Sequence, residues 1–219
     1  MEPASMSDSS QPGEVFIVDD DPAVRETLSL LFGNAGYSVV RFAEGVAFLR
    51  AAKERNPVCI ILDVHMPGKT GIDLLKELNA QDYPAPIFIM SGQGDIAMAV
   101  DAIRHGALDF IEKPFRGSVV VQKVREAIDA MASRRSSGAE QAVPDLHFPG
   151  REPLTRRERE VLVCLTSGAS NKEAARQLGI GPRTVEYHRA RLMEKLGARN
   201  VADLVRIVMS EGRSSAKAR

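Results

Sequence analysis

Residues 15–22 read VFIVDDDP, so four apolar residues run directly into three aspartates and a proline. A nearly continuous apolar run of this length is typical of a central strand in a parallel sheet that is covered on both faces. Four further short apolar runs follow, at residues 39–42 (interrupted by Arg41), 59–62, 87–90 and 110–111. Segments with helical spacing separate these runs. The pattern predicts an α/β domain with a doubly wound, five-stranded parallel sheet.

Charge is unevenly distributed along the 219 residues, although the 29 Lys and Arg balance the 29 Asp and Glu. Residues 14–126 hold 12 basic and 16 acidic side chains, whereas residues 151–219 hold 15 basic and 8 acidic ones. Two regions of opposite charge indicate two different kinds of partner. The basic excess favours nucleic acid as the partner of the C-terminal region.

Several classes of protein are excluded by what the chain lacks. No apolar run approaches the ~20 residues that a membrane-spanning helix requires. The first 13 residues have neither the basic start nor the apolar stretch of a secretory signal. Cys59 and Cys164 lie far apart in apolar runs, which favours reduced core residues over a disulfide or a metal site. We therefore expect a cytoplasmic protein with no membrane partner.

The composition changes between residues 133 and 153, where Ser, Gly, Pro and charged residues dominate and no periodicity survives. This change is typical of a linker, with an extension of the preceding helix at its start. We expect a first domain over residues 14–131, a linker over 132–152 and a second domain over 153–212.

The second domain has only helical patterns. Thr155 with Glu158, and Ser170 with Glu173, match the capping box that opens a helix. Pro182 suits the first position of a third helix, which should run to about residue 196. A fourth helix is expected over residues 201–209. Four short helices with tight turns predict a small all-α domain, whose second and third helices form a helix-turn-helix.

Polar residues follow the predicted strands of the first domain. In a parallel α/β sheet, reactive groups gather at the carboxyl ends of the strands. Reading the strand ends in order gives Asp19, Asp20, Asp21, Asp63, Ser91 and Lys113. Each has an ordinary explanation, and Asp21 before a proline is most simply a helix N-cap. Together, however, like charges at one place require a cation, and carboxylates suit Mg²⁺.

Four motifs on these strand ends, VDDDP, LDVHMPG, MSGQGD and DFIEKPF, resemble the receiver domain of two-component response regulators, which has a flavodoxin-like fold. The resemblance covers about residues 14–130. It implies that Asp63 accepts a phosphoryl group from a sensor histidine kinase. The implied Mg²⁺ ligands are Asp19, Asp20, Asp63 and the backbone carbonyl of His65. The residues implied to bind the phosphoryl group or to act as the conformational switch are Ser91, Phe110 and Lys113, and Pro114 is expected to follow a cis peptide bond.

The segments LTRREREVL, GASNKEAARQLGI and RTVEYHRARLMEKLG are similar to the LuxR-type helix-turn-helix. With the receiver, they make the chain resemble a transcriptional regulator of the NarL/FixJ family. On the third helix, Val185, Leu192 and Leu196 share the core face. The DNA-facing candidates are Lys172, Arg183, Thr184, Glu186, Tyr187, Arg191 and Lys195. His188 is expected to be a structural hydrogen-bonding residue, and Gly181 a weaker cap than the Ser or Thr often found there.

Other interpretations of the strand-end residues are weaker. Haloacid-dehalogenase-type phosphatases also use a strand-end Asp with Mg²⁺, but they carry a second Asp where this chain has His65. A DNA-binding protein whose receiver only dimerises, without phosphate, would not need the full set of Asp20, Asp63, Ser91 and Lys113. His65 either meets the water that hydrolyses the phosphorylated state or points to solvent, and the sequence leaves both open. We expect no enzymatic activity beyond self-dephosphorylation.

The opposite charges of the two domains indicate how they meet at rest, and the resemblance implies how they act after phosphorylation. The acidic receiver is expected to dock against the basic domain, or at least to hinder its pairing on promoter DNA. Phosphorylation should then produce a homodimer through the surface around Arg104, Phe110 and Val119, bringing two DNA-binding domains onto one site.

Overall fold

The computed structural model describes residues 13–92, 96–136, 148 and 151–211. Five parallel strands form one sheet in the order β2-β1-β3-β4-β5. The strands are β1 (Glu14–Val18), β2 (Ser38–Phe42), β3 (Cys59–Asp63), β4 (Ile87–Ser91) and β5 (Asp109–Glu112). Each lies within one or two residues of an apolar run in the sequence. The order reverses at β1 and β3, which is the switch point where doubly wound sheets place their sites.

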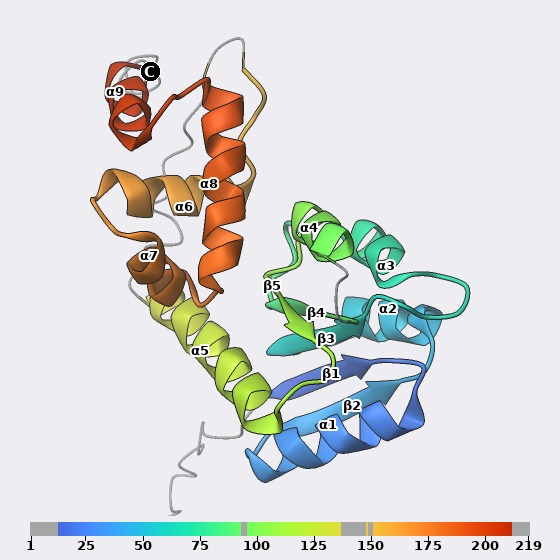
Figure 1. Cartoon of the computed structure of the whole chain (residues 1–219). Helices are drawn as coiled ribbons and strands as arrows, with labels where there is room; N and C mark the ends of the chain where they lie inside the picture. The colour runs from blue at the N-terminus through green and yellow to red at the C-terminus, as the bar shows by residue number, and fades with distance from the viewer. Residues whose placement is uncertain (1–12, 93–95, 137–147, 149–150, 212–219) are drawn as a thin grey trace, which may run out of the picture.

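Five helices belong to the same domain, and they cover both faces of the sheet (Figure 1). They are α1 (Pro22–Asn34), α2 (Gly45–Glu54), α3 (Gly71–Leu78), α4 (Ile96–Arg104) and α5 (Gly117–Ser136). Alternate residues of β1 point to opposite faces. Ile17 packs in the cluster with α1 and α5, whereas Phe16 packs in the cluster with α2, α3 and α4. Burial on both faces explains why the strand sequences are continuously apolar.

The C-terminal domain consists of four short helices in the part of the chain that the structure describes. They are α6 (Arg156–Thr166), α7 (Asn171–Leu178), α8 (Pro182–Leu196) and α9 (Val201–Glu211). Thr155 and Ser170 each form the predicted capping box with the glutamate three residues on. Pro182 occupies the first turn of α8, as expected. The helix-turn-helix prediction for α7 and α8 is therefore confirmed.

Helix α5 reaches from the sheet to the C-terminal domain, where its end contacts α7 (Figure 1). It extends to Ser136, so the first residues of the predicted linker are helical, as the sequence suggested. Most of the remaining linker lies outside the described residues. A Cβ atom on Gly179 would lie 2.8 Å from Cα of Ala127, so the two segments meet backbone to backbone. The cores of both domains merge there into one apolar cluster.

No helix in the described ranges combines the length and the apolar character that crossing a bilayer demands.

Candidate functional site

The acidic site lies where β1 and β3 end side by side. Register pairs Val18 with Leu62, so Asp19 and Asp63 leave the sheet at the same edge. A carboxylate oxygen from each of Asp19, Asp20 and Asp63 can be found within 4.8 Å of the other two. Asp19 is fully buried and Asp63 is 4% exposed, whereas Asp20 is exposed to solvent. The structure thus brings together the three carboxylates that the sequence predicted.

Lys113 joins two of these carboxylates from the loop after β5. Its Nζ donates to Oδ2 of Asp19 at 2.9 Å and to Oδ1 of Asp63 at 2.8 Å. The backbone supports this position, because the Lys113 N–H donates to the carbonyl of Ser91 at 2.8 Å. The following bond to Pro114 is cis, as predicted. The ammonium group therefore lies beside the carboxylates of Asp19 and Asp63, and its binding of a phosphoryl group remains a prediction.

The charge states follow from burial and proximity. Burial raises the pKa of Asp63, with Asp19 and Asp20 adding to the rise and Lys113 opposing it. Burial lowers the pKa of Lys113, but its bonds to Asp63 and Asp19 raise it by more, so it stays protonated. One ammonium group faces three carboxylates, and the surplus negative charge is a site for a hard cation. Three carboxylate oxygens with open solvent at Asp20 fit Mg²⁺, which keeps several waters.

Ser91 and Phe110 occupy neighbouring strands beside the acidic site. Ser91 ends β4 and is 3% exposed. Phe110 lies on β5 and is half-buried, with Nζ of Lys123 5.4 Å from the centre of its ring. His65 is exposed in the loop after β3. These positions agree with the predicted roles, which remain predictions.

Two residues that support this site were missed by the sequence reasoning. Arg25 on α1 donates from its guanidinium to the backbone carbonyl of Asp19 at 2.6 Å. Gly71 starts α3, and a Cβ atom there would lie 2.3 Å from the carbonyl oxygen of Asp63. The glycine at position 71 was the one signal of this close approach in the sequence. It resembles an ordinary turn residue, so it gave no indication of the contact.

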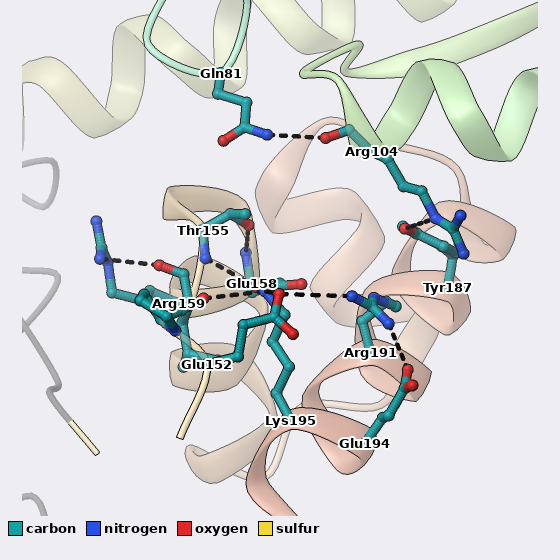
Figure 2. Close-up of polar contacts among 12 residues, drawn as sticks. Gln81, Arg104, Glu152, Thr155, Glu158, Arg159, Tyr187, Arg191, Glu194 and Lys195 are labelled. Atoms are coloured by element: carbon teal, nitrogen blue, oxygen red, sulfur yellow. Dashed lines mark hydrogen bonds and ion pairs between the residues drawn. The ribbon is translucent and has the colours of Figure 1, made fainter. Parts of the chain in front are cut away.

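Some of the DNA-facing candidates are exposed, and others are hydrogen-bonded to residues of the receiver. Lys172, Arg183 and Glu186 are exposed. Thr184 is buried and its hydroxyl donates to Oδ1 of Asp109 on β5 at 2.7 Å. The hydroxyl of Tyr187 accepts a hydrogen bond of 3.2 Å from Nε of Arg104 (Figure 2).

Arg191 and Lys195 belong to a charged network at the other end of α8 (Figure 2). Arg191 donates to Glu194 at 2.5 Å. Nζ of Lys195 lies 2.9 Å from carboxylate oxygens of both Glu152 and Glu158, and its side chain is only 5% exposed. The exposed phosphate contact expected of Lys195 is therefore not available in this arrangement.

Comparison with known proteins identifies both domains. The response regulator receiver domain family matches residues 15–125, and the LuxR family of bacterial regulatory proteins matches residues 152–208. The transcriptional regulatory protein FixJ of Azorhizobium caulinodans is 40% identical over 198 residues, covering 90% of this chain and 92% of the relative. This chain is a NarL/FixJ-family response regulator.

Further relatives have the same organisation. Response regulator protein TmoT of Ectopseudomonas mendocina is 39% identical, over 91% of this chain and 89% of its own. The structure of full-length FixJ from B. japonicum aligns with a TM-score of 0.54 and 38% identity, covering 92% of this chain and 98% of that one. The response regulator thus combines a receiver with a LuxR-type DNA-binding domain and acts in transcriptional regulation.

Besides the contact of α5 with α7, the two domains of this response regulator meet at α8. Both contacts use its N-terminal half: Asp109 binds Gly181 and Thr184, and Arg104 binds Tyr187. Asp109 itself pairs with Lys123 of α5 at 2.9 Å. The sequence reasoning missed Asp109 and Lys123, because their partners are remote along the chain.

His188 does not have the role that the sequence predicted for it. It is 4% exposed, and neither ring nitrogen has a hydrogen-bond partner among the described residues. It lines a cavity of about 80 Å³ between the response regulator's two domains, together with Arg104, Leu108 and Arg157. Burial, and then the charge of Arg157, lower its pKa to about 3. His188 is therefore a neutral buried residue rather than a hydrogen-bonding one.

Proposed function

We propose that a sensor histidine kinase phosphorylates this response regulator on Asp63, and that the phosphorylated form dimerises and binds promoter DNA. The observation that carries the proposal is the position of Lys113, whose Nζ lies within 2.9 Å of both Asp19 and Asp63. A fixed cation beside a buried carboxylate is what an incoming phosphoryl group needs.

The chemistry requires little beyond positioning and charge neutralisation. An Oδ atom of Asp63 forms the new bond to phosphorus while the bond from phosphorus to the kinase's histidine nitrogen breaks. Lys113 neutralises charge on the phosphoryl oxygens, and the hydroxyl of Ser91 donates to one of them. Asp19, Asp20, Asp63 and the carbonyl of His65 would hold Mg²⁺. Bound there, the ion would neutralise the remaining charge on the transferred group.

Docking of the domains supports a resting state with masked DNA-binding residues. Thr184 and Tyr187 contact the receiver, so they are not free to meet base edges. Arg104, which is expected at the receiver dimer surface, makes the contact to Tyr187. Docking and dimerisation therefore compete for the same side chain. We propose that phosphorylation shifts the equilibrium from docking to dimerisation.

Mass spectrometry tests the first step directly. The full chain is treated with acetyl phosphate and Mg²⁺, and we expect a single phosphoryl adduct that Asp63→Asn abolishes. Asp82→Asn is the matched control, because Asp82 is an exposed receiver carboxylate remote from the strand ends. Chelation of the metal should also prevent labelling. Equal labelling of wild type and Asp63→Asn would show that the assignment is wrong.

The second step is tested with the same material. Treated and untreated chains are compared by sedimentation and by binding to a DNA duplex selected from a random pool. Coupling between two sites in one protein is typically ~1–3 kcal/mol, which corresponds to roughly 5- to 150-fold in affinity. A phosphorylated chain that stays monomeric and binds DNA no more tightly would contradict the proposal.

A further inference from the structure

Helix α8 begins without the capping box that α6 and α7 of the same domain have. In α6 and α7, the side chain at the third helical position, Glu158 or Glu173, accepts the backbone N–H of the N-cap residue at 2.8 Å. In α8 the N-cap is Gly181, which has no side chain, and the third helical position is Thr184. The first N–H groups of a helix have no partners within the helix. In α8, Pro182 has no N–H and the N–H of Thr184 bonds to the carbonyl of Gly181, so it is the N–H of Gly181 that needs a partner from elsewhere.

The receiver provides the missing carboxylate. Oδ2 of Asp109 accepts the N–H of Gly181 at 2.7 Å, and its Oδ1 accepts the hydroxyl of Thr184 at 2.7 Å. The bond to Gly181 takes the place of the one within α7, where Glu173 accepts the N–H of the N-cap residue Ser170. The hydroxyl bond differs, because it comes from the third helical position in α8 and from the N-cap residue in α7. Asp109 is 1% exposed and Thr184 is 3% exposed, so water does not compete for the bonds.

Glycine at position 181 also makes room for this contact. A Cβ atom on Gly181 would lie 3.0 Å from Oδ2 of Asp109, which is tighter than an ordinary contact. A serine here would supply its own cap and push against the receiver. The glycine therefore both creates the need for an external carboxylate and admits it.

Asp109 is connected to the residue expected to act as the switch. Its Oδ1 also accepts the N–H of Phe110 at 2.9 Å. Lys123 pairs with Asp109 at 2.9 Å, donates to the carbonyl of Phe110 at 2.6 Å, and lies against the Phe110 ring. Hydrogen bonds weaken steeply once distance or angle departs from the ideal. A displacement of Phe110 would therefore disturb the bonds from Asp109 to α8.

We propose that Asp109 is a positioning residue that completes the capping box of the recognition helix from the other domain. We name Asp109, Gly181 and Thr184 the interdomain capping box. It holds α8 against the receiver in the resting state, and its loss frees Thr184 and the N-terminal half of α8. The regulatory part of this inference rests on the proposed function. The interdomain capping box itself does not.

Hydrogen exchange of backbone amides in the full chain, measured by NMR, tests the contact without DNA. Among the residues that the structure describes, the amide of Gly181 bonds to Asp109 alone, whereas the amide of Ser170 bonds within its own helix and is an internal control. Asp109→Ala should speed exchange at Gly181 by about 10-fold, the size expected for losing one cap. Exchange at Ser170 should not change. Glu26→Gln, an exposed carboxylate on α1 paired with Arg41, should change neither.

Gly181→Ser gives a second variant that leaves the receiver intact. It restores a cap within α8 and crowds Asp109, so untreated chain should bind a random-sequence duplex about 10-fold more tightly than untreated wild type. Two results would show that the inference is wrong. One is that the Gly181 amide exchanges as fast in wild type as in Asp109→Ala. The other is that Gly181→Ser leaves DNA binding unchanged. Adding beryllofluoride and Mg²⁺ to wild type should speed exchange at Gly181. If only this last result fails, phosphorylation control is contradicted and the interdomain capping box stands.

Discussion

Nζ of Lys113 lies 2.8 Å from Oδ1 of Asp63, although the two residues are 50 positions apart in the chain. The same ammonium group reaches Asp19, so one side chain holds the ends of β1 and β3 to the loop after β5. The contact neutralises part of the negative charge of the buried Asp63 at the edge of the sheet.

Replacing Lys113 should therefore slow phosphorylation more than replacing any surface lysine would. We expect Lys113→Met to slow labelling by acetyl phosphate about 100-fold, as for loss of one charge-stabilising donor. Lys113→Arg should recover part of the rate, because the charge is kept. Lys69→Met, which removes an exposed lysine paired with Glu77, is the control. Time-resolved mass spectrometry measures the labelling rates. Equal rates for Lys113→Met and wild type would contradict the role of Lys113 in phosphorylation.

Alanine substitutions at Gly71 and Gly33 should have opposite effects on the free energy of unfolding. A Cβ on Gly71 would lie 2.3 Å from the backbone oxygen of Asp63, whereas a Cβ on Gly33 has nothing within 4 Å. Gly71→Ala should lower the free energy of unfolding by about 1–3 kcal/mol through overpacking. Gly33→Ala lies within α1 and should raise it by about 0.5–1 kcal/mol. Urea titration followed by circular dichroism checks both, and Gly71→Ala as stable as wild type would refute the close approach.

His188 should make stability depend on pH. Its pKa is about 3 in the folded chain against 6.5 ordinarily, so the unfolded chain binds the proton more readily between these values. Stability should therefore fall as pH drops below about 6.5, by up to about 1.4 kcal/mol per pH unit for this one group.

His188→Gln removes the titrating group and should flatten the pH dependence over this range, whatever its effect at neutral pH. His105→Gln is the control, because His105 is only partly buried and pairs with Asp101. Urea titrations at several pH values measure the slopes. Identical slopes for wild type and His188→Gln would contradict burial of a neutral imidazole.

On DNA, Arg191 and Lys172 should behave differently. Arg191→Ala should cost about 1–3 kcal/mol at specific sites and relax sequence preference, whereas Lys172→Ala should weaken all sequences alike and reduce the salt dependence. The phosphorylated full chain is titrated onto specific and scrambled duplexes at several salt concentrations. Equal losses on both duplexes for Arg191→Ala would exclude base recognition.

Most of the fold could be predicted from local patterns in the sequence. Apolar runs placed all five strands, because both faces of the sheet are buried and the strands cannot be mistaken for surface segments. Asp21 caps α1 as predicted, accepting the N–H of Ala23. The strand-end residues Asp19, Asp63 and Lys113 meet because parallel strands share a carboxyl edge, which follows from topology alone.

What the sequence did not reveal depends on contacts between the domains. Asp109 resembled an ordinary residue near a strand end, and its bonds to Gly181 need the second domain to be in place. Tyr187 fitted a DNA-facing surface by helical periodicity and Thr184 was predicted to face DNA, yet both residues contact the receiver. Periodicity identifies an exposed face but not what occupies it.

The close approach of Gly179 to α5 restricts how this regulator can be recombined. A chimera that joins this DNA-binding domain to a foreign receiver at Ser136 keeps the covalent connection, but it also imports whatever side chain stands at position 130. A bulky residue there would push α7 away from α5, since a Cβ atom on Gly179 would already lie 3.0 Å from Cβ of Ala130. Exchange of the receiver therefore meets a steric limit at the joint, and a small residue at position 130 is the feature to preserve.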